Sequence, residues 1–300
     1  MSAPRYLLSI VGQSNEQGSA TGARDFVAAL GAPSADSTTT GSWWPALAEL
    51  AAERGVWLAV ARTAVGSTSL CDSWVGRCRQ WGSGMAVAIG SYVKVTDGGL
   101  WRSSSTTGTS TTEPSGTTNT TLNSINWVYV GVATAEDVDG VIYATTSSRY
   151  DPNGYLAAAI TALTNTGFYR RGVVVSIGQG DHTVGSTLAQ YSTAMQRVAA
   201  QFTAAGHTVW LGMTCYMAGT AARETTFQTV LLPGLSDALS ALSNNGLVKR
   251  GANLRESLGV LPIVADQVSL GVQVDELHMN AYTLRLAAAQ WNASLQAGGW

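Results

Sequence analysis

The stretch Leu7-Leu8-Ser9-Ile10-Val11-Gly12-Gln13-Ser14-Asn15-Glu16-Gln17-Gly18 decides the fold class of this chain. Its mostly apolar residues run directly into a short polar turn, which is typical of a buried strand that exits into a helix or loop. Gly12 permits a sharp backbone turn at that exit. Ser14 then stands at the carboxyl end of a central strand, where open α/β sheets bind their ligands. A serine in such a turn is often only a cap, so its role depends on the other strand exits.

Apolar strands alternate with helical segments along the chain, which indicates a parallel sheet covered on both faces. Strands are expected at 6–11, 56–64, 173–177 and 208–215, with a short one near 260–263. Helices are expected at 44–54, 154–165, 187–205, 227–244 and 281–295. Pro233 predicts a break or kink in the fourth of these helices.

The segment 91–135 interrupts this alternation. Its middle, 103–112, is rich in Ser, Thr and Gly and cannot build a core by itself. Its ends, 92–95 and 126–130, alternate as strands do. A flexible linker is one interpretation, and we favour a small inserted β module, whose pattern resembles modules of bacteriophage tail fibres and tailspikes. The predicted domains are therefore a discontinuous main domain, 1–90 plus 136–300, and the insert.

Composition excludes several classes of partner. The chain of 300 residues has a net charge of −2, and only 12% of its residues are charged. These values give no electrostatic basis for nucleic-acid binding, and no run of like charges favours an anionic membrane. The apolar run near the N-terminus is too short for a membrane span and lacks the layout of a signal peptide.

The cysteines leave one question open. Cys71 and Cys78 flank a short loop that can close as a disulfide or hold two thiols, and their spacing does not decide between these states. Cys215 follows an apolar run and is expected to be a small buried hydrophobe. No second pair of ligands lies at a suitable spacing for zinc, so no metal site is expected.

A base for Ser14 is expected near the C-terminus, in Asp275-Glu276-Leu277-His278. One turn of backbone can bring the Asp275 carboxylate to the His278 imidazole and fix its tautomer. Of the other two histidines, His207 precedes a strand and so belongs at the amino end of the sheet. His182 follows a strand at the correct end, but its nearest acid is adjacent in sequence, so we favour His278 as the base.

Donors for an oxyanion are expected at two further strand exits. Gly66 follows the second strand and can expose its backbone N–H. Gln179 follows the third strand between two glycines, so its side-chain amide can reach inward. With the N–H of Ser14, these groups make three donors from three strand ends.

Four blocks at these strand exits resemble the SGNH-type (GDSL-like) hydrolases, and most closely the branch of sialate O-acetylesterases and carbohydrate acetylesterases. The blocks are Gly12-Gln13-Ser14-Asn15, Val65-Gly66-Ser67-Thr68-Ser69-Leu70 followed by Trp74, Gln179-Gly180-Asp181, and Asp275-Glu276-Leu277-His278. Two positions depart from the pattern, since Ser67 replaces a common Gly and Asp181 replaces a usual Glu. The Gly-x-Ser-x-Gly elbow of α/β-hydrolases is absent from the sequence, which disfavours that fold.

The resemblance implies a flavodoxin-like three-layer α/β/α sandwich of about five parallel strands in the order 2-1-3-4-5. It implies ester hydrolysis through an acyl-enzyme on Ser14, with His278 as base and Asp275 as its partner, and with no metal or other cofactor. The oxyanion hole would consist of Ser14, Gly66 and Gln179. An acetylated carbohydrate is the implied substrate, with a sugar hydroxyl as leaving group.

Six residues near the blocks are candidate substrate contacts: Gln13, Asn15, Trp74, Trp81, Asp181 and His182. Two other functions stay open. One is an esterase of the same fold acting on lipids or thioesters, and the other is a catalytically silent glycan-binding tail module. The expected location is extracellular or virion-associated without a signal peptide, or alternatively cytoplasmic, and oligomerisation is left open.

Overall fold

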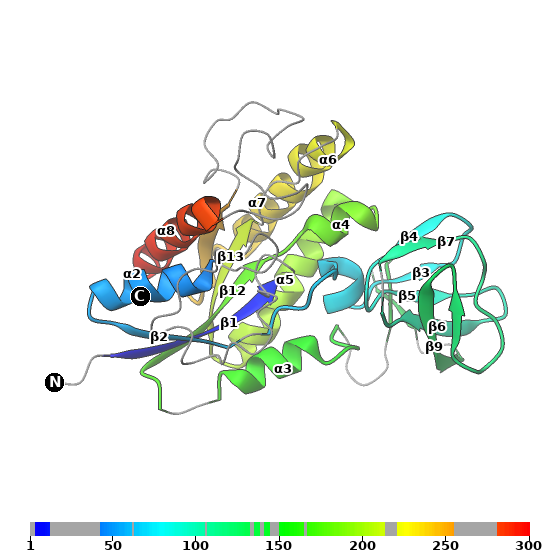
Figure 1. The fold of residues 1–300 in the computed structure, drawn as a ribbon, viewed down its shortest axis with the longest axis horizontal. Coiled ribbons are helices and arrows are strands. Elements are labelled where there is room, and N and C mark those ends of the chain that lie inside the picture. The colour runs from blue at the N-terminus through cyan, green and yellow to red at the C-terminus, as the bar shows by residue number, and fades with distance from the viewer. Residues whose placement is uncertain are drawn as a thin grey trace.

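The computed structural model of the chain describes residues 4–12, 43–61, 63–105, 107–132, 135–138, 141–144, 150–164, 167–213, 221–254 and 281–300. Five parallel strands form the central sheet: β1 (Arg5–Gly12), β2 (Trp57–Ala61), β12 (Arg170–Ser176), β13 (Thr208–Met213) and β14 (Val248–Asn253). Their order is β14-β13-β12-β1-β2 (Figure 1). Counted along the chain this is 2-1-3-4-5, so the predicted α/β class and strand order are confirmed.

Both faces of the sheet are buried, and successive residues of a strand point alternately into the two cores. Leu8 and Ile10 belong to one core, and Leu7 and Val11 belong to the other. The first core is covered by α2 (Trp44–Glu53) and α8 (Ala281–Ala297), and the second by α3 (Tyr155–Ala162), α5 (Leu188–Ala204) and α7 (Leu232–Ala241). The chain therefore forms three layers, with helices on each side of the strands (Figure 1).

A tryptophan fixes α8 on the sheet. The ring of Trp291 is fully buried and lies over the backbone of β13 and β14. A Cβ at Gly212 would come within 2.5 Å of this ring, and one at Gly251 within 2.7 Å. Only glycine leaves room for so close an approach of a helix side chain to the strands.

The helices follow the sequence pattern closely. Thr187 caps α5, where Gln190 N donates to Thr187 Oγ1 at 3.3 Å and Thr187 N donates to Gln190 Oε1 at 3.1 Å. The segment 227–244, expected as one kinked helix, consists of a π-helical turn η3 (Phe227–Leu231) and α7, and a further helix, α6 (Ala221–Thr226), directly precedes it. Pro233 lies in the first turn of α7, where its missing N–H costs no hydrogen bond.

The sequence pattern missed the fifth strand. β14 reads Val-Lys-Arg-Gly-Ala-Asn and lies at an edge of the sheet, where half-exposed charged residues hide the apolar signal. The strand expected near 260–263 falls outside the described residues.

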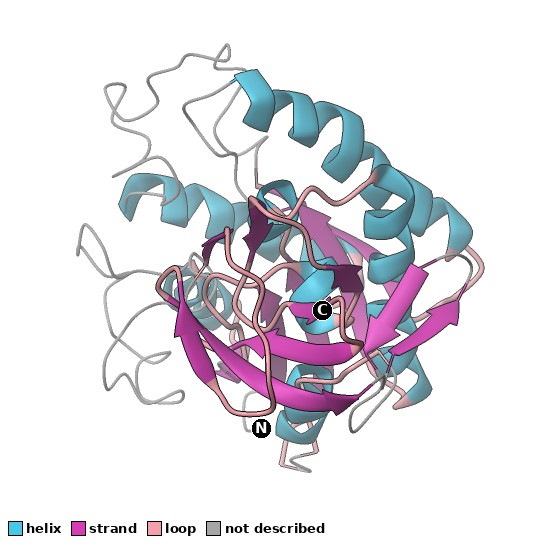
Figure 2. Ribbon diagram, turned by 90° about the vertical axis from the view of Figure 1, so that its right-hand side faces the viewer, coloured by secondary structure: helices cyan, strands magenta, loops and turns pink. Residues whose placement is uncertain are grey.

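In the part of the insert that the structure describes there are nine strands: β3 (Cys78–Gln80), β4 (Met85–Val87), β5 (Tyr92–Lys94), β6 (Gly99–Ser103), β7 (Gly108–Ser110), β8 (Thr120–Leu122), β9 (Ile125–Val132), β10 (Ala135–Val138) and β11 (Val141–Ala144). Its main sheet is mixed, in the order β3-β5-β6-β9-β8. Trp101 and Trp127 lie at the centre of a separate small core. Figure 2, which faces the insert, shows its strands in front of the flanking helices.

The insert is thus a folded β module and not a linker. It extends beyond the expected 91–135 at both ends, because β3 and β4 pair with strands inside that range and β10 and β11 reach residue 144. It is also tied to the main domain, since Tyr92 Oη donates to Pro152 O at 3.2 Å. No helix in the described part of the chain is long and apolar enough to cross a membrane.

Candidate active site

The strand that leads to Ser14 is in the expected place. β1 lies at the centre of the sheet between β12 and β2, and it ends at Gly12, two residues before Ser14. Ser14 itself lies outside the described residues, as do Gln13, Asn15, Asp275 and His278. The predicted triad therefore stays a prediction, and the described site is the framework around it.

The helix that follows His278 in the sequence, α8, runs from the carboxyl edge of the sheet toward its amino edge. The chain end beyond α8 lies at the amino edge, where the Trp300 ring packs edge-on against Tyr6 at 5.1 Å between centroids. α8 has 17 residues and is therefore roughly 25 Å long. Its first residue, Ala281, consequently lies toward the carboxyl edge, three positions after His278 in the sequence.

The turn after β2 is fastened to the end of β1. Thr63 Oγ1 donates to Ile10 O at 2.7 Å and accepts from Ile10 N at 3.0 Å. Val65 N then donates to Gly12 O at 3.1 Å. Gly66, which is half-buried, therefore follows directly on the contact between the first two blocks.

The same turn holds Ser67, one of the two positions that depart from the blocks described above, in an unusual backbone conformation. Ser67 has a φ of 58°, in the left-handed region where glycine is favoured. This conformation accounts for the glycine that is common at this position in the sequences that the block resembles. Ser67 is exposed, so its side chain occupies no space in the core.

Asp181 joins the third block to the second. It lies in α4 (Gln179–Thr183), and its side chain is fully buried. Its carboxylate accepts from Leu70 N at 2.7 Å, from Cys71 N at 3.0 Å and from Ser186 Oγ at 2.9 Å. Burial raises the pKa of Asp181, although these hydrogen bonds favour the carboxylate. The prediction that Asp181 contacts substrate is not supported, because its oxygens are occupied within the core.

Gly180 lets α4 press against the turn after β2. A Cβ at Gly180 would lie 2.2 Å from Thr68 O and 2.9 Å from Ser69 N. Any other residue would push the two segments apart. Gln179, the first residue of α4, is only 4% exposed and lies beside this contact. The predicted oxyanion residues Gly66 and Gln179 thus belong to two segments that are in backbone contact.

Trp74 packs inside the core beneath the turn after β2, and its ring is not exposed to solvent. It ends η2 (Leu70–Trp74), is fully buried, and donates from Nε1 to Thr68 Oγ1 at 3.0 Å. Thr68 Oγ1 in turn donates to Val65 O at 2.7 Å. The predicted substrate contact at Trp74 is therefore corrected to a core position, because neither face of the ring is open.

Trp81 and His182 also have partners within the protein. Trp81 is half-buried in the core of the insert, and its Nε1 donates to Ser110 Oγ at 3.1 Å. His182 Nδ1 lies 2.8 Å from Thr226 Oγ1 of α6. Burial and the nearby Arg223 lower the pKa of His182. The ring of His182 is thus turned toward α6.

A buried ion cluster beneath the turn had no signal in the sequence. The Asp72 carboxylate is fully buried, with Arg77 Nε at 2.6 Å and Arg79 Nε at 3.0 Å. Burial alone would lower the pKa of Arg77, but the ion pair with Asp72 raises it above its ordinary value. Arg77 also hydrogen-bonds Gln190 of α5. The cluster joins η2, α5 and the insert, and its partners are brought together only by folding.

Of three comparisons with known proteins, only the comparison with solved structures finds a similarity. No protein-family model matches the sequence, and neither does any curated protein. The fold is similar to the solved structure of a mutant of Axe2, an acetyl-xylooligosaccharide esterase from Geobacillus Stearmophilus, with a TM-score of 0.50. The two chains are 10% identical, and the match covers 100% of this chain and 97% of that chain. At this identity the similarity concerns the fold.

Proposed function

We propose that this protein is a serine esterase that removes O-acetyl groups from carbohydrates. The observation that carries the proposal is the joining of three strand exits at one edge of the sheet. Val65 N binds Gly12 O, and the Asp181 carboxylate binds Leu70 N. Segments far apart in the sequence, each carrying a residue of the predicted oxyanion hole, are thereby held together. Such fixed donors are what ester hydrolysis requires.

In the proposed mechanism, Ser14 Oγ adds to the ester carbonyl as His278 takes its proton. The backbone N–H groups of Ser14 and Gly66 and the amide of Gln179 stabilise the resulting oxyanion. His278 then protonates the sugar hydroxyl that leaves, and the acetyl group stays on Ser14. Water next attacks this ester while His278 accepts one of its protons, and His278 then returns that proton to Ser14 Oγ as the bond to the acetyl group breaks and acetate leaves. Asp275 stabilises the imidazolium in both steps.

The carbohydrate part of the proposal has two supports. The four sequence blocks resemble the carbohydrate acetylesterase branch, and the fold resembles that of an esterase acting on acetylated xylo-oligosaccharides. We propose that an acetylated oligosaccharide or polysaccharide binds at the carboxyl edge of the sheet.

Acetate release from a panel of acetylated saccharides, including acetylated xylo-oligosaccharides, tests the proposal. Ser14→Ala should lower the rate by several orders of magnitude, as loss of a triad member does, and leave the thermal midpoint nearly unchanged. Labelling of the wild type by a serine-directed fluorophosphonate, absent in Ser14→Ala, should agree. Near-normal turnover in Ser14→Ala would refute the serine mechanism.

The same assays distinguish the two alternatives. Activity that rises with acyl chain length on simple esters would favour a lipid esterase. Absence of both turnover and fluorophosphonate labelling, with saccharide binding retained, would favour a silent glycan-binding module.

A further inference from the structure

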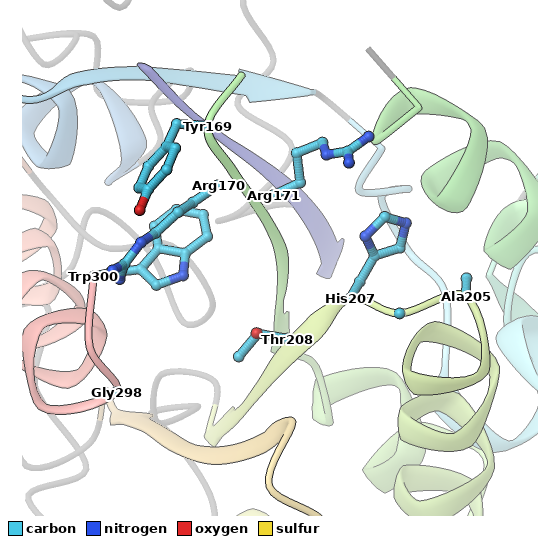
Figure 3. Close-up of a pocket in the computed structure, with 9 residues that line it drawn as sticks. Tyr169, Arg170, Arg171, Ala205, His207, Thr208, Gly298 and Trp300 are labelled. Carbon is cyan, nitrogen blue, oxygen red and sulfur yellow. The ribbon is translucent and has the colours of Figure 1, made fainter. Parts of the chain in front are cut away.

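We propose that a second site, at the amino edge of the sheet, binds the carboxylate-bearing ring of an acidic sugar, such as a uronic acid. A cavity of about 370 Å³ lies there, and its chemistry is set by Tyr169, Arg170, Arg171, His207 and Trp300. Figure 3 shows the two arginines on opposite sides of β12, with Arg170 beside Trp300 and Arg171 beside His207.

This cavity is separate from the candidate active site. Arg170 and Thr208 are the first residues of β12 and β13, whereas the proposed catalytic turns follow the last residues of the strands. β12 has seven residues, so its two ends lie about 20 Å apart. A ligand in the cavity would therefore not touch the proposed nucleophile, and the inference does not depend on the proposed esterase activity.

Arg170 supplies an available anion-binding group. Its guanidinium lies 5.6 Å from the Tyr6 ring and 5.7 Å from the Tyr169 ring, which holds it by cation–π contact. It makes no hydrogen bond or ion pair with any residue that the structure describes. The planar fork of an arginine matches a carboxylate with two parallel hydrogen bonds.

The rest of the lining favours the same charge. Arg171 uses one N–H on Leu163 O, at 3.2 Å, and keeps its positive charge at the cavity. No Asp or Glu is among the residues that line the cavity. The whole chain has a net charge of −2, so this positive region is local and favours an anion at this place in particular.

Two aromatic rings indicate that the anion is part of a sugar. Tyr169 is 74% exposed, which is unusual for so large an aromatic side chain. Trp300 is held edge-on by Tyr6 at 5.1 Å and by Trp210 at 4.9 Å. Rigid aromatic rings at a surface present apolar faces at little entropic cost, and these faces suit the C–H face of a sugar ring. A simple inorganic anion would gain nothing from them.

A matched pair of ligands tests the inference. Methyl β-D-glucuronide and methyl β-D-glucoside differ only in carrying a carboxylate or a hydroxymethyl group. In NMR titrations of the full chain we expect the glucuronide to bind about tenfold more tightly or better, as loss of one charged hydrogen-bonding group implies. Arg170→Gln should remove this preference, and Tyr169→Ala should weaken binding of both sugars.

Arg250→Gln is the control. Arg250 is an exposed arginine in β14 of the same sheet and does not line the cavity, so its substitution should leave binding unchanged. Equal affinity for the two sugars, or an unaltered preference in Arg170→Gln, would overturn the proposal. So would inorganic sulfate binding as tightly as the glucuronide, because that result would indicate a simple anion site. If Arg170→Gln does not fold, the exposed position of Tyr169 still allows the test with Tyr169→Ala.

Discussion

The carboxylate of Asp181 accepts a hydrogen bond from the backbone N–H of Leu70 at 2.7 Å, although the two residues are 111 positions apart. This contact fixes the start of η2, and with it the turn that carries Gly66, against the helix that begins with Gln179. Asp181, which the sequence suggested as a substrate contact, therefore supports the proposed oxyanion hole.

The first prediction concerns this support. Asp181→Asn keeps the shape of the side chain but turns an N–H₂ group toward backbone N–H donors. We expect the free energy of unfolding to fall by about 1–3 kcal/mol, the cost of leaving a buried donor unsatisfied. We also expect kcat of the folded enzyme to fall with KM nearly unchanged, because the turn is no longer fixed. Denaturant unfolding and steady-state kinetics on an acetate ester measure the two effects.

Ser186→Ala is the matched control for that variant. It removes one donor to the Asp181 carboxylate and leaves the bonds from Leu70 and Cys71 in place. Its losses should be clearly smaller. Wild-type stability in Asp181→Asn would show that the three hydrogen bonds do not hold the turn.

The second prediction concerns Gln179. An oxyanion donor acts on charge that develops in the transition state, so Gln179→Ala should lower kcat by roughly 10²- to 10³-fold with little change in KM. Because Gln179 is only 4% exposed, some loss of stability is expected as well. The kinetics should therefore be measured well below the unfolding midpoint. A loss confined to stability, with kcat of the folded fraction intact, would contradict the oxyanion role.

The third prediction concerns the thiols of Cys71 and Cys78, which are both buried and free. Burial, and secondarily the nearby Asp72, raises the pKa of Cys78 to about 12. Burial and then Asp181 raise the pKa of Cys71 as well. At pH 8 only roughly one Cys78 side chain in ten thousand would be a thiolate, which is the reactive form.

Thiol titration with Ellman's reagent in a Cys215→Ser background tests this state. The native protein should react very slowly at pH 8, and two thiols should react quickly in denaturant. Absence of reaction in denaturant, reversed by a reductant, would instead show that the two cysteines form a disulfide.

The fourth prediction concerns pH. Burial, and then Arg171, lowers the pKa of His207 below its ordinary value of 6.5. Below pH 6.5 the unfolded chain therefore binds a proton that the folded chain does not yet bind. The stability associated with neutral His207 is present above pH 6.5 and is lost as pH falls toward the lowered pKa. Thermal midpoints between pH 7 and pH 5 should fall less steeply in His207→Gln than in the wild type, and equal slopes would contradict the assignment.

The sequence by itself determined the class of fold, and its resemblance to the SGNH-type hydrolases implied the order of the strands. Runs such as Leu7 to Val11 and 173–177 are apolar at every position but one serine each, and this composition is typical of a strand buried on both faces. Capping residues such as Thr187 are equally local, so the helix ends were predictable within a few residues. The sequence pattern did not predict the edge strand β14, because an edge strand is less buried and needs fewer apolar residues.

Only the tertiary structure decided what each polar or aromatic residue near the site contacts. The type and spacing of Trp74 and Asp181 suited a ligand contact, yet the fold places both in the core. Their partners, Thr68 for one and Leu70 for the other, follow from how α4 docks on the turn after β2. A sequence records which groups can hydrogen-bond, but the partner that satisfies a buried group is chosen when distant segments pack, because an unsatisfied buried group is costly.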